Sequence, residues 1–404
     1  MTIELKRLNL NLASAKPSAT YKMIDCVAER RAAGKQVISL TAGEPDFDTP
    51  AHVRDAAIDA ILSGKTRYTQ VSGLRELREA VAIKFHRENG IDVTWQDTIV
   101  CNGGKQALFN ALAATLNIGD QVIIPAPYWV SYPDMVQLSG ATPIIVPCSE
   151  ANGFKLTPEL LTRSITPHSR WLILNSPSNP TGAVYTKLEL LELAEVLLAY
   201  PQVLILSDDI YEHLIFDNQS FHTMAQIEPR LRERTLTMNG VSKAYAMTGW
   251  RIGFATGPRW ILEAMETLQG QQTSGACSIS QYAALAALSG PQDFVRETCK
   301  VFQSRRDEVV TRLNDIPGLR CAKPLGAFYA FVSCEELIGK TTAAGTVLRS
   351  DEDVALSLLA EQGVATVHGS AFGLGPYLRL AYALDDQSLR QACSLIEKFT
   401  NNLH

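Results

Sequence analysis

Short apolar runs alternate with longer amphipathic segments through the middle of the chain. The apolar runs have the length of strands and cover residues 98–101, 121–124, 143–146, 171–175, 203–207 and 235–238. Segments of helical length cover residues 106–116, 129–138 and 187–199. The runs are apolar throughout, which is typical of strands in a parallel sheet covered on both faces. Repeated strand–helix–strand units predict an α/β fold with a doubly wound sheet.

The two ends of the chain show a different pattern. Residues 73–89 predict a helix, because Leu74, Leu77, Val81 and Phe85 recur on one face. Later elements are expected in the order helix 293–313, strand 327–332, helix 352–361, strand 378–382 and helix 386–399. We therefore expect a small α+β domain built from residues 1–48 plus 297–404, and a large domain from residues 49–296.

Composition narrows the class of protein. Hydrophobic residues make up 46% and charged residues 20% of the chain, which excludes a disordered, collagen-like or coiled-coil protein. The formal net charge of −5 argues against nucleic-acid binding, which goes with a basic excess. No apolar run approaches the roughly 18 residues of a membrane helix, and residues 1–12 lack the apolar core of a signal peptide. We expect a cytoplasmic protein that binds neither nucleic acid nor membrane.

Cysteines, histidines and glycines provide no metal or nucleotide motif. The eight cysteines form no CxxC pair and the seven histidines no HExxH pattern, so we expect no metal site. The GKT triplets at residues 64–66 and 339–341 lack the upstream glycine of a P-loop. Residues 240–244 differ from a GxSxG nucleophile elbow in their last residue, so we interpret them as a chance match. No GxGxxG follows a predicted strand, so a classical dinucleotide-binding fold has no support.

Residues 242–253 contain the most informative polar pair. Lys243 lies among small and apolar residues after a predicted strand, where loss of hydration lowers the pKa of a lysine. A neutral lysine can form a Schiff base with a carbonyl group. Arg251, eight residues later, is a fixed cation that suits a phosphate. The alternative is a surface lysine and arginine beside a turn.

Two loops follow other predicted strands, at the edge where open α/β sheets bind ligands. Residues 176–182 form a rigid loop of prolines and glycine that presents Asn179, either as an uncharged donor or as a plain turn residue. In residues 103–106, glycines open a predicted helix, where backbone N–H groups can hold a phosphate.

A third loop, residues 207–213, carries acids and a tyrosine. Asp208 could pair with a cationic ring nitrogen, and Tyr211 could hydrogen-bond the same ring. The alternative is a helix N-cap formed by Asp208 or Asp209.

Together these motifs resemble a known family. SPSNPTG (176–182), SDDIYEHL (207–214) and SKAYAMTGWRIG (242–253) resemble class I aminotransferases that use pyridoxal phosphate (PLP) and have fold type I. The segments that narrow the resemblance are KPSAT (16–20), TAGEPDFDTP (41–50), GGKQALFN (103–110), APYWVSYP (126–133) and HGSAFGLGP (368–376). They are similar to the 1β subgroup of aspartate aminotransferases, which includes bifunctional aspartate/prephenate enzymes. This resemblance implies a large, mostly parallel seven-stranded sheet and a smaller domain.

The resemblance implies a PLP site at residues that match the family's motifs. Lys243 would bond the cofactor, Asp208 would keep the pyridine nitrogen protonated, and Tyr211 and Asn179 would hydrogen-bond the phenolic oxygen. The other implied contacts are Trp129 against the ring, Gly104, Lys105 and Arg251 at the phosphate, and Tyr68 from the neighbouring subunit of a homodimer. Many relatives have serine where this chain has Gly240, so one phosphate contact is either missing or supplied by Ser242.

The same resemblance implies that the substrates are small amino and keto acids. Arg379 would bind the α-carboxylate bidentately together with Gly43. Other implied substrate contacts are Trp129, Asn179, Ser18, Thr20 and Lys105, and Lys16 for prephenate. Without the resemblance, Lys16 would be interpreted as a solvated charge.

The expected reaction is a ping-pong amino transfer from aspartate or glutamate, in which Lys243 moves a proton between the substrate Cα and the cofactor. Oxaloacetate, 2-oxoglutarate, prephenate and glyoxylate all stay open as acceptors. The alternatives are an aromatic aminotransferase, a fold type I lyase, and a non-catalytic PLP-binding regulator. The intact set of candidate residues argues against the regulator.

Overall fold

The predicted α/β sheet is present in the computed structural model, which describes residues 11–12 and 19–404. Seven strands lie in the order β2-β8-β7-β6-β5-β3-β4. Their bounds are β2 Thr98–Asn102, β3 Gln121–Ala126, β4 Thr142–Pro147, β5 Ser169–Asn175, β6 Leu204–Asp208, β7 Thr235–Gly240 and β8 Ile252–Thr256. Strand β8 runs in the direction opposite to the other strands of this sheet and pairs antiparallel with both β2 and β7. The sheet is therefore mixed and mostly parallel, as predicted, although β8 itself was not foreseen.

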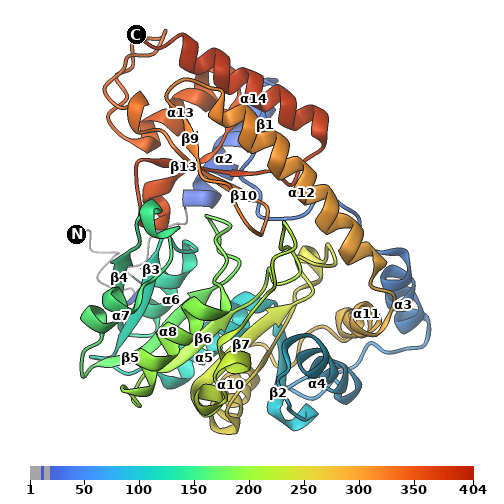
Figure 1. The fold of residues 1–404 in the computed structure, drawn as a ribbon. Helices are drawn as coiled ribbons and strands as arrows, with labels where there is room; N and C mark the ends of the chain where they lie inside the picture. Colours follow the sequence, from blue (N-terminus) through green and yellow to red (C-terminus); the bar gives the residue numbers. More distant parts are fainter. Residues whose placement is uncertain (1–10, 13–18) are drawn as a thin grey trace, which may run out of the picture.

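Helices cover both faces of this sheet (Figure 1). Their bounds are α3 Ala51–Leu62, α4 Arg75–Asn89, α5 Gly104–Thr115, α6 Ser131–Leu138, α7 Pro158–Ser164, α8 Lys187–Leu198, α9 Met224–Ile227, α10 Arg259–Gln272 and α11 Ser278–Ser289. In β5, Trp171 and Ile173 pack in a core with α5, α6 and α10, whereas Leu172 and Leu174 pack in another with α7 and α8. Successive side chains of a strand point to opposite faces, which explains why the predicted strands are apolar throughout.

The start of helix α8 is set by hydrogen bonds of its own first residues. Thr186 and Glu189 form a reciprocal capping box that starts α8 at the predicted residue. The helices predicted at residues 73–89 and 129–138 begin two residues later, at Arg75 and Ser131.

No helix in the described part of the chain is long and apolar enough to cross a membrane.

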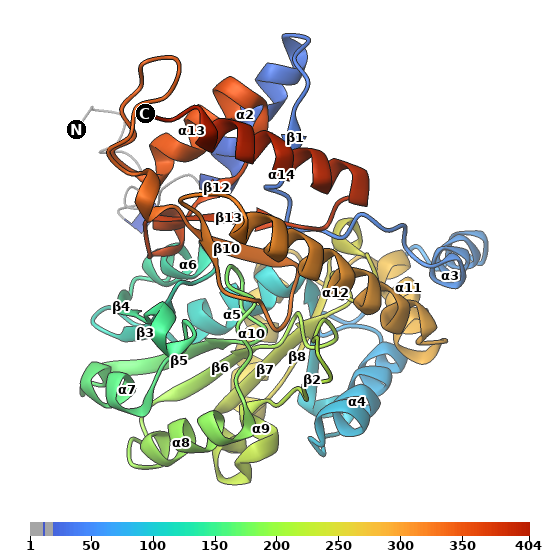
Figure 2. The ribbon, with the colours of Figure 1, turned by 45° about the horizontal axis from the view of Figure 1, so that its top comes forward.

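A smaller unit is built from both ends of the chain (Figures 1 and 2). Its four-stranded sheet has the order β12-β13-β10-β9, and β1 pairs in parallel with β11. The strand bounds are β1 Ile38–Ser39, β9 Arg320–Cys321, β10 Tyr329–Ser333, β11 Val364–Ala365, β12 Val367–His368 and β13 Tyr377–Ala381. The helices are α2 Ala19–Ala32, α12 Asp293–Asn314, α13 Asp351–Gln362 and α14 Asp386–Asn401.

One core joins the two ends of the chain in this unit. Met23 and Val27 of α2 pack with Phe302 of α12 and Phe399 of α14. The domain boundary expected at residues 296/297 falls inside α12, a single helix that runs from the small unit towards α11 (Figure 1). The division into two domains stays a prediction.

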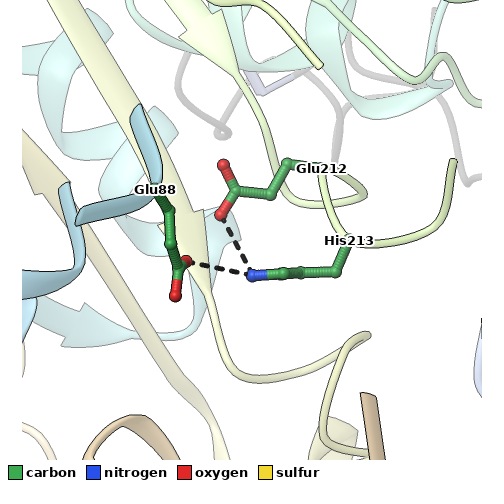
Figure 3. Close-up of side chains that lie close together, drawn as sticks. All are labelled: Glu88, Glu212 and His213. Atoms are coloured by element: carbon green, nitrogen blue, oxygen red, sulfur yellow. Dashed lines mark hydrogen bonds and ion pairs between the residues drawn. The ribbon is translucent and has the colours of Figure 1, made fainter. Parts of the chain in front are cut away.

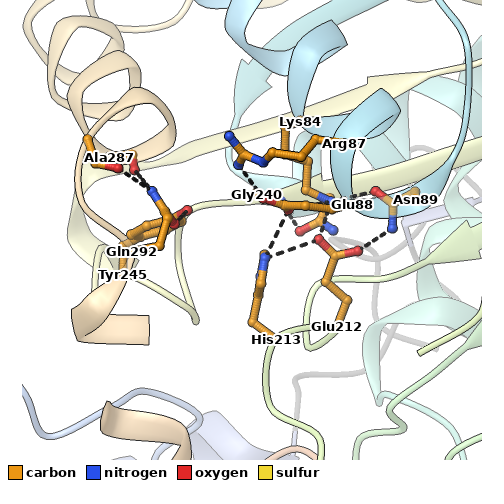
Figure 4. Close-up of polar contacts among 12 residues, drawn as sticks. Lys84, Arg87, Glu88, Asn89, Glu212, His213, Gly240, Tyr245, Ala287 and Gln292 are labelled. Atoms are coloured by element: carbon orange, nitrogen blue, oxygen red, sulfur yellow. Dashed lines mark hydrogen bonds and ion pairs between the residues drawn. The ribbon is translucent and has the colours of Figure 1, made fainter. Parts of the chain in front are cut away.

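A buried ionic network ties α4 to the loop after β6 (Figures 3 and 4). The Lys84 and Glu212 side chains form an ion pair and are only 1% and 3% exposed. Lys84 Nζ donates to Asn89 Oδ1 at 2.7 Å, and Asn89 Nδ2 donates to Glu212 Oε2 at 2.6 Å. Because Glu212 follows Tyr211 directly, the network anchors the loop that carries this candidate site residue.

Glu88 and His213 complete this network. His213 Nε2 lies 3.1 Å from Glu88 Oε2 and 3.6 Å from Glu212 Oε1. These three side chains could offer ligand atoms to a metal ion, but Lys84 Nζ, 3.5 Å from Glu88 Oε2, already supplies a positive charge there. Burial raises the pKa of Glu88, but the hydrogen bond with His213 and the charge of Lys84 outweigh it and lower the pKa to about 2.

Lys84→Met should lower the free energy of unfolding by about 3–5 kcal/mol, because it leaves the Glu212 carboxylate buried without its cation. Denaturant titration measures this loss. The matched control is Arg296→Met, which breaks the exposed Arg296–Asp293 pair and should change the free energy by less than about 1 kcal/mol. Similar losses for both variants would contradict a supporting role for the network.

Candidate active site

A cavity of about 470 Å³ lies where the carboxyl ends of β5 and β6 approach the small unit. Asn175 and Asp208 end these strands, while Tyr329 of β10 and Arg379 of β13 reach the cavity from the smaller sheet. The predicted site residues brought together here are Gly43, Gly104, Lys105, Trp129, Asn179, Asp208, Tyr211, Lys243, Arg251 and Arg379. Their position matches the edge where open α/β sheets bind ligands.

Four of the predicted site residues are not among those lining the cavity. Tyr68 is 98% exposed on the loop after α3. Lys16 and Ser18 lie outside the described residues, and only the backbone of Thr20 is described, at the start of α2.

Lys243 is placed as a nucleophile. The residue follows the end of β7, and its Nζ donates to the carbonyl oxygen of Gly43 at 2.5 Å. Burial lowers the pKa of Lys243 to about 8, helped by the positive charges of Arg251 and Arg379 and opposed by Glu44. A substantial fraction of this amine is therefore neutral near physiological pH and able to attack a carbonyl carbon.

Asp208 is the one acid that lines the cavity among the described residues. Burial raises its pKa to about 6, although the hydroxyl of Tyr132, which donates to Oδ2 at 2.5 Å, acts in the opposite direction. The neighbouring Asp209 accepts instead from Ser207 Oγ at 2.7 Å and does not line the cavity. Of the two acids, only Asp208 is positioned to pair with a cationic ring nitrogen.

The start of α5 and Arg251 form an anion site. Helix α5 begins at Gly104 without a side-chain cap, so its first N–H groups are available to a ligand. A Cβ on Gly103, which has φ 81°, would lie 2.4 Å from Arg251 Nη2, so glycine allows the guanidinium to approach the helix start. Ser242 also lines this cavity, whereas Gly240 is not among its lining residues.

Arg379 is a buried cation with unused hydrogen-bonding capacity. It donates through Nη2 to the carbonyl oxygen of Thr41 at 2.6 Å and through Nη1 to Asn179 Oδ1 at 3.3 Å. Its Nε has no partner within the described chain, and no acidic side chain there forms an ion pair with it. A guanidinium that is 3% exposed and lacks a carboxylate partner suits an anionic ligand.

Among the described residues, basic side chains outnumber acidic ones around the cavity. The lining residues include four cations, Lys105, Lys243, Arg251 and Arg379, against the single acid. Lys105 Nζ lies 4.9 Å from the ring centroid of Trp129, and partial loss of hydration together with the charge of Arg251 lowers the pKa of this lysine. The excess of positive charge favours a ligand with more than one anionic group.

Sequence reasoning missed two phenols of this site. Tyr132 holds Asp208, and Tyr329 lies 2.7 Å from Tyr211, hydroxyl to hydroxyl. Tyr132 lies three residues after Trp129, at the start of α6, so its place in the segment 126–133 could have suggested it. No local pattern marks Tyr329, because it reaches the cavity from the other sheet.

These residues fit PLP. An amine of lowered pKa would hold the aldehyde, a buried acid would hold the ring nitrogen, and a helix start beside an arginine would hold the phosphate. Trp129 offers an aromatic face next to the cationic Lys105, and Tyr211 offers a phenol. The donor set thus matches each polar group of this cofactor.

Comparisons with known proteins agree with this site. A model of the family Aminotransferase class I and II matches residues 35–396. An aspartate/prephenate aminotransferase from Cereibacter sphaeroides is 56% identical over 98% of this chain and 99% of that protein. The crystal structure of the aspartate aminotransferase from Rhizobium meliloti has a TM-score of 0.96 at 48% identity, over 98% of this chain and 100% of that one. The aspartate aminotransferase from Thermus thermophilus, solved with maleate, has a TM-score of 0.90 at 40% identity, over 97% and 99% of the two chains.

The family match covers most of the chain, and the solved relatives share the fold over nearly its full length. Both findings confirm the resemblance and the fold type that the motifs predicted. This protein belongs to the class I and II aminotransferases, a family of PLP-dependent enzymes.

Proposed function

We propose that this protein exchanges an amino group between L-aspartate or L-glutamate and a 2-oxo acid, with PLP as cofactor and prephenate as one acceptor. The observation that carries the proposal is Arg379, a buried guanidinium without an acidic partner in the described chain, in the same cavity as Lys243. The names of the relatives support an acidic substrate, as does the maleate, a short dicarboxylate, in the Thermus thermophilus structure.

Each residue would have a defined task in the reaction. Bound PLP supplies an electron sink that weakens the bonds at the substrate Cα. Lys243 Nζ takes the proton from Cα, since its pKa of about 8 suits both uptake and release. Asp208 holds a proton on the ring nitrogen, and Tyr211 donates to the phenolic oxygen. Arg379 binds the α-carboxylate and so fixes Cα beside Lys243.

A second carboxylate needs a second cation. Lys105 supports this role, because it is exposed at the cavity with its ammonium over Trp129. We propose Lys16, Ser18 and Thr20 as further contacts of the distal carboxylate, on the resemblance of the segment that contains them.

The cysteines support a reducing compartment. All eight are free, and burial raises the pKa of several thiols, such as Cys101 and Cys334, which keeps them unreactive. We propose that the enzyme works in the cytoplasm.

Aspartate and glutamate should convert the PLP form of the enzyme to the pyridoxamine form faster than phenylalanine or alanine does, because only the first two carry a distal carboxylate for the cationic cavity. Single-turnover absorbance with each amino acid measures the rates. Fastest conversion by phenylalanine would instead favour an aromatic aminotransferase. Release of a carbon fragment without the pyridoxamine form would favour a lyase.

We also propose a homodimer with shared active sites. Tyr68 is 98% exposed, and the nearby Leu62 is 79% exposed, which is unusual for two large side chains so close in sequence. A second copy of the chain would cover them and bring Tyr68 to the phosphate of its neighbour, as the resemblance implies.

Hybrid dimers of Lys243→Ala and Tyr68→Phe subunits should be more active than either parent homodimer. If sites are shared, one of the two sites in each hybrid has both Lys243 and Tyr68 intact. Aspartate transamination is measured after subunits of different tags are exchanged and the hybrids purified. Activity no higher than that of the Tyr68→Phe homodimer, in verified hybrids, would contradict shared sites.

Lys16→Ala should lower kcat/KM for prephenate about ten- to hundredfold and should affect oxaloacetate less. Loss of one charge-assisted hydrogen bond, worth roughly 1.5–3 kcal/mol, accounts for this range. A lysine suits two acceptors of different shape, because its ammonium is a mobile point charge. Steady-state kinetics with both acceptors provide the comparison, and equal losses would mean that Lys16 does not select between them.

A further inference from the structure

Tyr329 lines the cavity, and none of the cofactor or substrate roles proposed for this site belongs to it. It is fully buried on β10, and its hydroxyl is 2.7 Å from that of Tyr211. The Arg379 guanidinium lies 4.8 Å from the centroid of its ring. One side chain therefore contacts both the residue proposed for the cofactor's phenolic oxygen and the residue proposed for the substrate carboxylate.

Gly43 shows that the position of this phenol is tightly constrained. A Cβ on Gly43 would lie 2.8 Å from the Tyr329 hydroxyl oxygen, so any larger residue would displace the hydroxyl. The carbonyl oxygen of Gly43 accepts the hydrogen bond from Lys243 Nζ. The glycine thus brings the Tyr329 hydroxyl close to the backbone group that holds the nucleophile.

The hydrogen bond between the two phenols has a direction when cofactor is bound. A phenol has a single hydrogen to donate. If Tyr211 gives its hydrogen to the phenolic oxygen of PLP, as the proposed function has it, then Tyr329 must be the donor to Tyr211. Burial raises the pKa of both tyrosines, so both keep their hydrogens across the working pH range.

We propose that Tyr329 is a positioning residue with two separable actions: its hydroxyl donates to Tyr211, and its ring supports the Arg379 guanidinium. The first action makes Tyr211 a stronger donor, because successive hydrogen bonds polarise one another. The second uses a cation–π contact in a buried place, where such contacts are strongest. This inference rests on the proposed roles of Tyr211 and Arg379.

Tyr329→Phe removes the hydroxyl and keeps the ring. A hydrogen bond to the phenolic oxygen of bound PLP stabilises the negative charge on that oxygen. When this hydrogen bond is weakened, the proton on the neighbouring Lys243 nitrogen is held more tightly. The pH midpoint of the visible band of bound PLP should therefore rise by about 0.5 to 1 pH unit, and the dissociation constant for maleate should change by less than about threefold. Tyr211→Phe, which removes the direct donor, should raise the midpoint further.

Tyr329→Leu removes the ring as well. It should weaken maleate binding about fivefold or more in addition to raising the midpoint, because Arg379 loses one of its two cation–π contacts within the described chain and keeps only the contact with Phe372, 5.0 Å from its ring centroid. The matched control is Tyr382→Phe, which removes the hydroxyl of a phenol buried in the same core that donates to the carbonyl oxygen of Ala327. This control should leave both the midpoint and maleate binding unchanged.

These readouts separate the inference from the proposed function. An unchanged midpoint in Tyr329→Phe, with PLP bound, would overturn the donor role even if aspartate is a good substrate. Equal maleate affinity in Tyr329→Phe and Tyr329→Leu would overturn the support of Arg379. Failure of aspartate to react would reject the proposed substrate, while the midpoint of the band would still test Tyr329.

Discussion

The excess of positively charged side chains around one cavity is the constraint on which the site depends. Two lysines, two arginines and one acid of the described chain line it, so anionic ligands are favoured. The same crowding acts on the nucleophile, because burial and the charges of Arg251 and Arg379 together bring the pKa of Lys243 to about 8. Attraction of anions and activation of the amine are therefore two results of one arrangement.

The fold supplies this arrangement by joining two sheets. The carboxyl ends of β5 and β6 present Asn175 and Asp208, and the small sheet presents Arg379 beside Tyr329. The ion pair of Lys84 and Glu212 holds the loop after β6 against α4 (Figure 4). Two consecutive residues of this loop thus have different tasks, since Tyr211 lines the cavity and Glu212 anchors the loop.

Residues that directly follow strands could be predicted from the sequence. The carboxyl ends of neighbouring parallel strands share one edge, so loops such as that of Asn179 were expected at the ligand-binding edge. The resemblance then implied that Asp208 and Lys243 belong to one site. Tyr329 could not be predicted, because nothing in its local pattern says how the small sheet packs on the large one. Strand β8 was missed because its run begins directly after Arg251, within the segment analysed for chemistry. Tyr68 was assigned to a site, yet it is 98% exposed in a single chain, since its proposed contact needs a second copy.

The most direct measurement is the rate at which PLP becomes covalently linked to Lys243 in PLP-free protein as pH is varied. Only the neutral amine reacts, so the rate should rise with pH through a midpoint of about 8, and borohydride reduction followed by peptide mapping should place the label on Lys243. Saturation with maleate should move the midpoint upward, because the bound dicarboxylate offsets the charge of Arg379. A midpoint near the ordinary lysine value of about 10.4, or label on another lysine, would contradict the account.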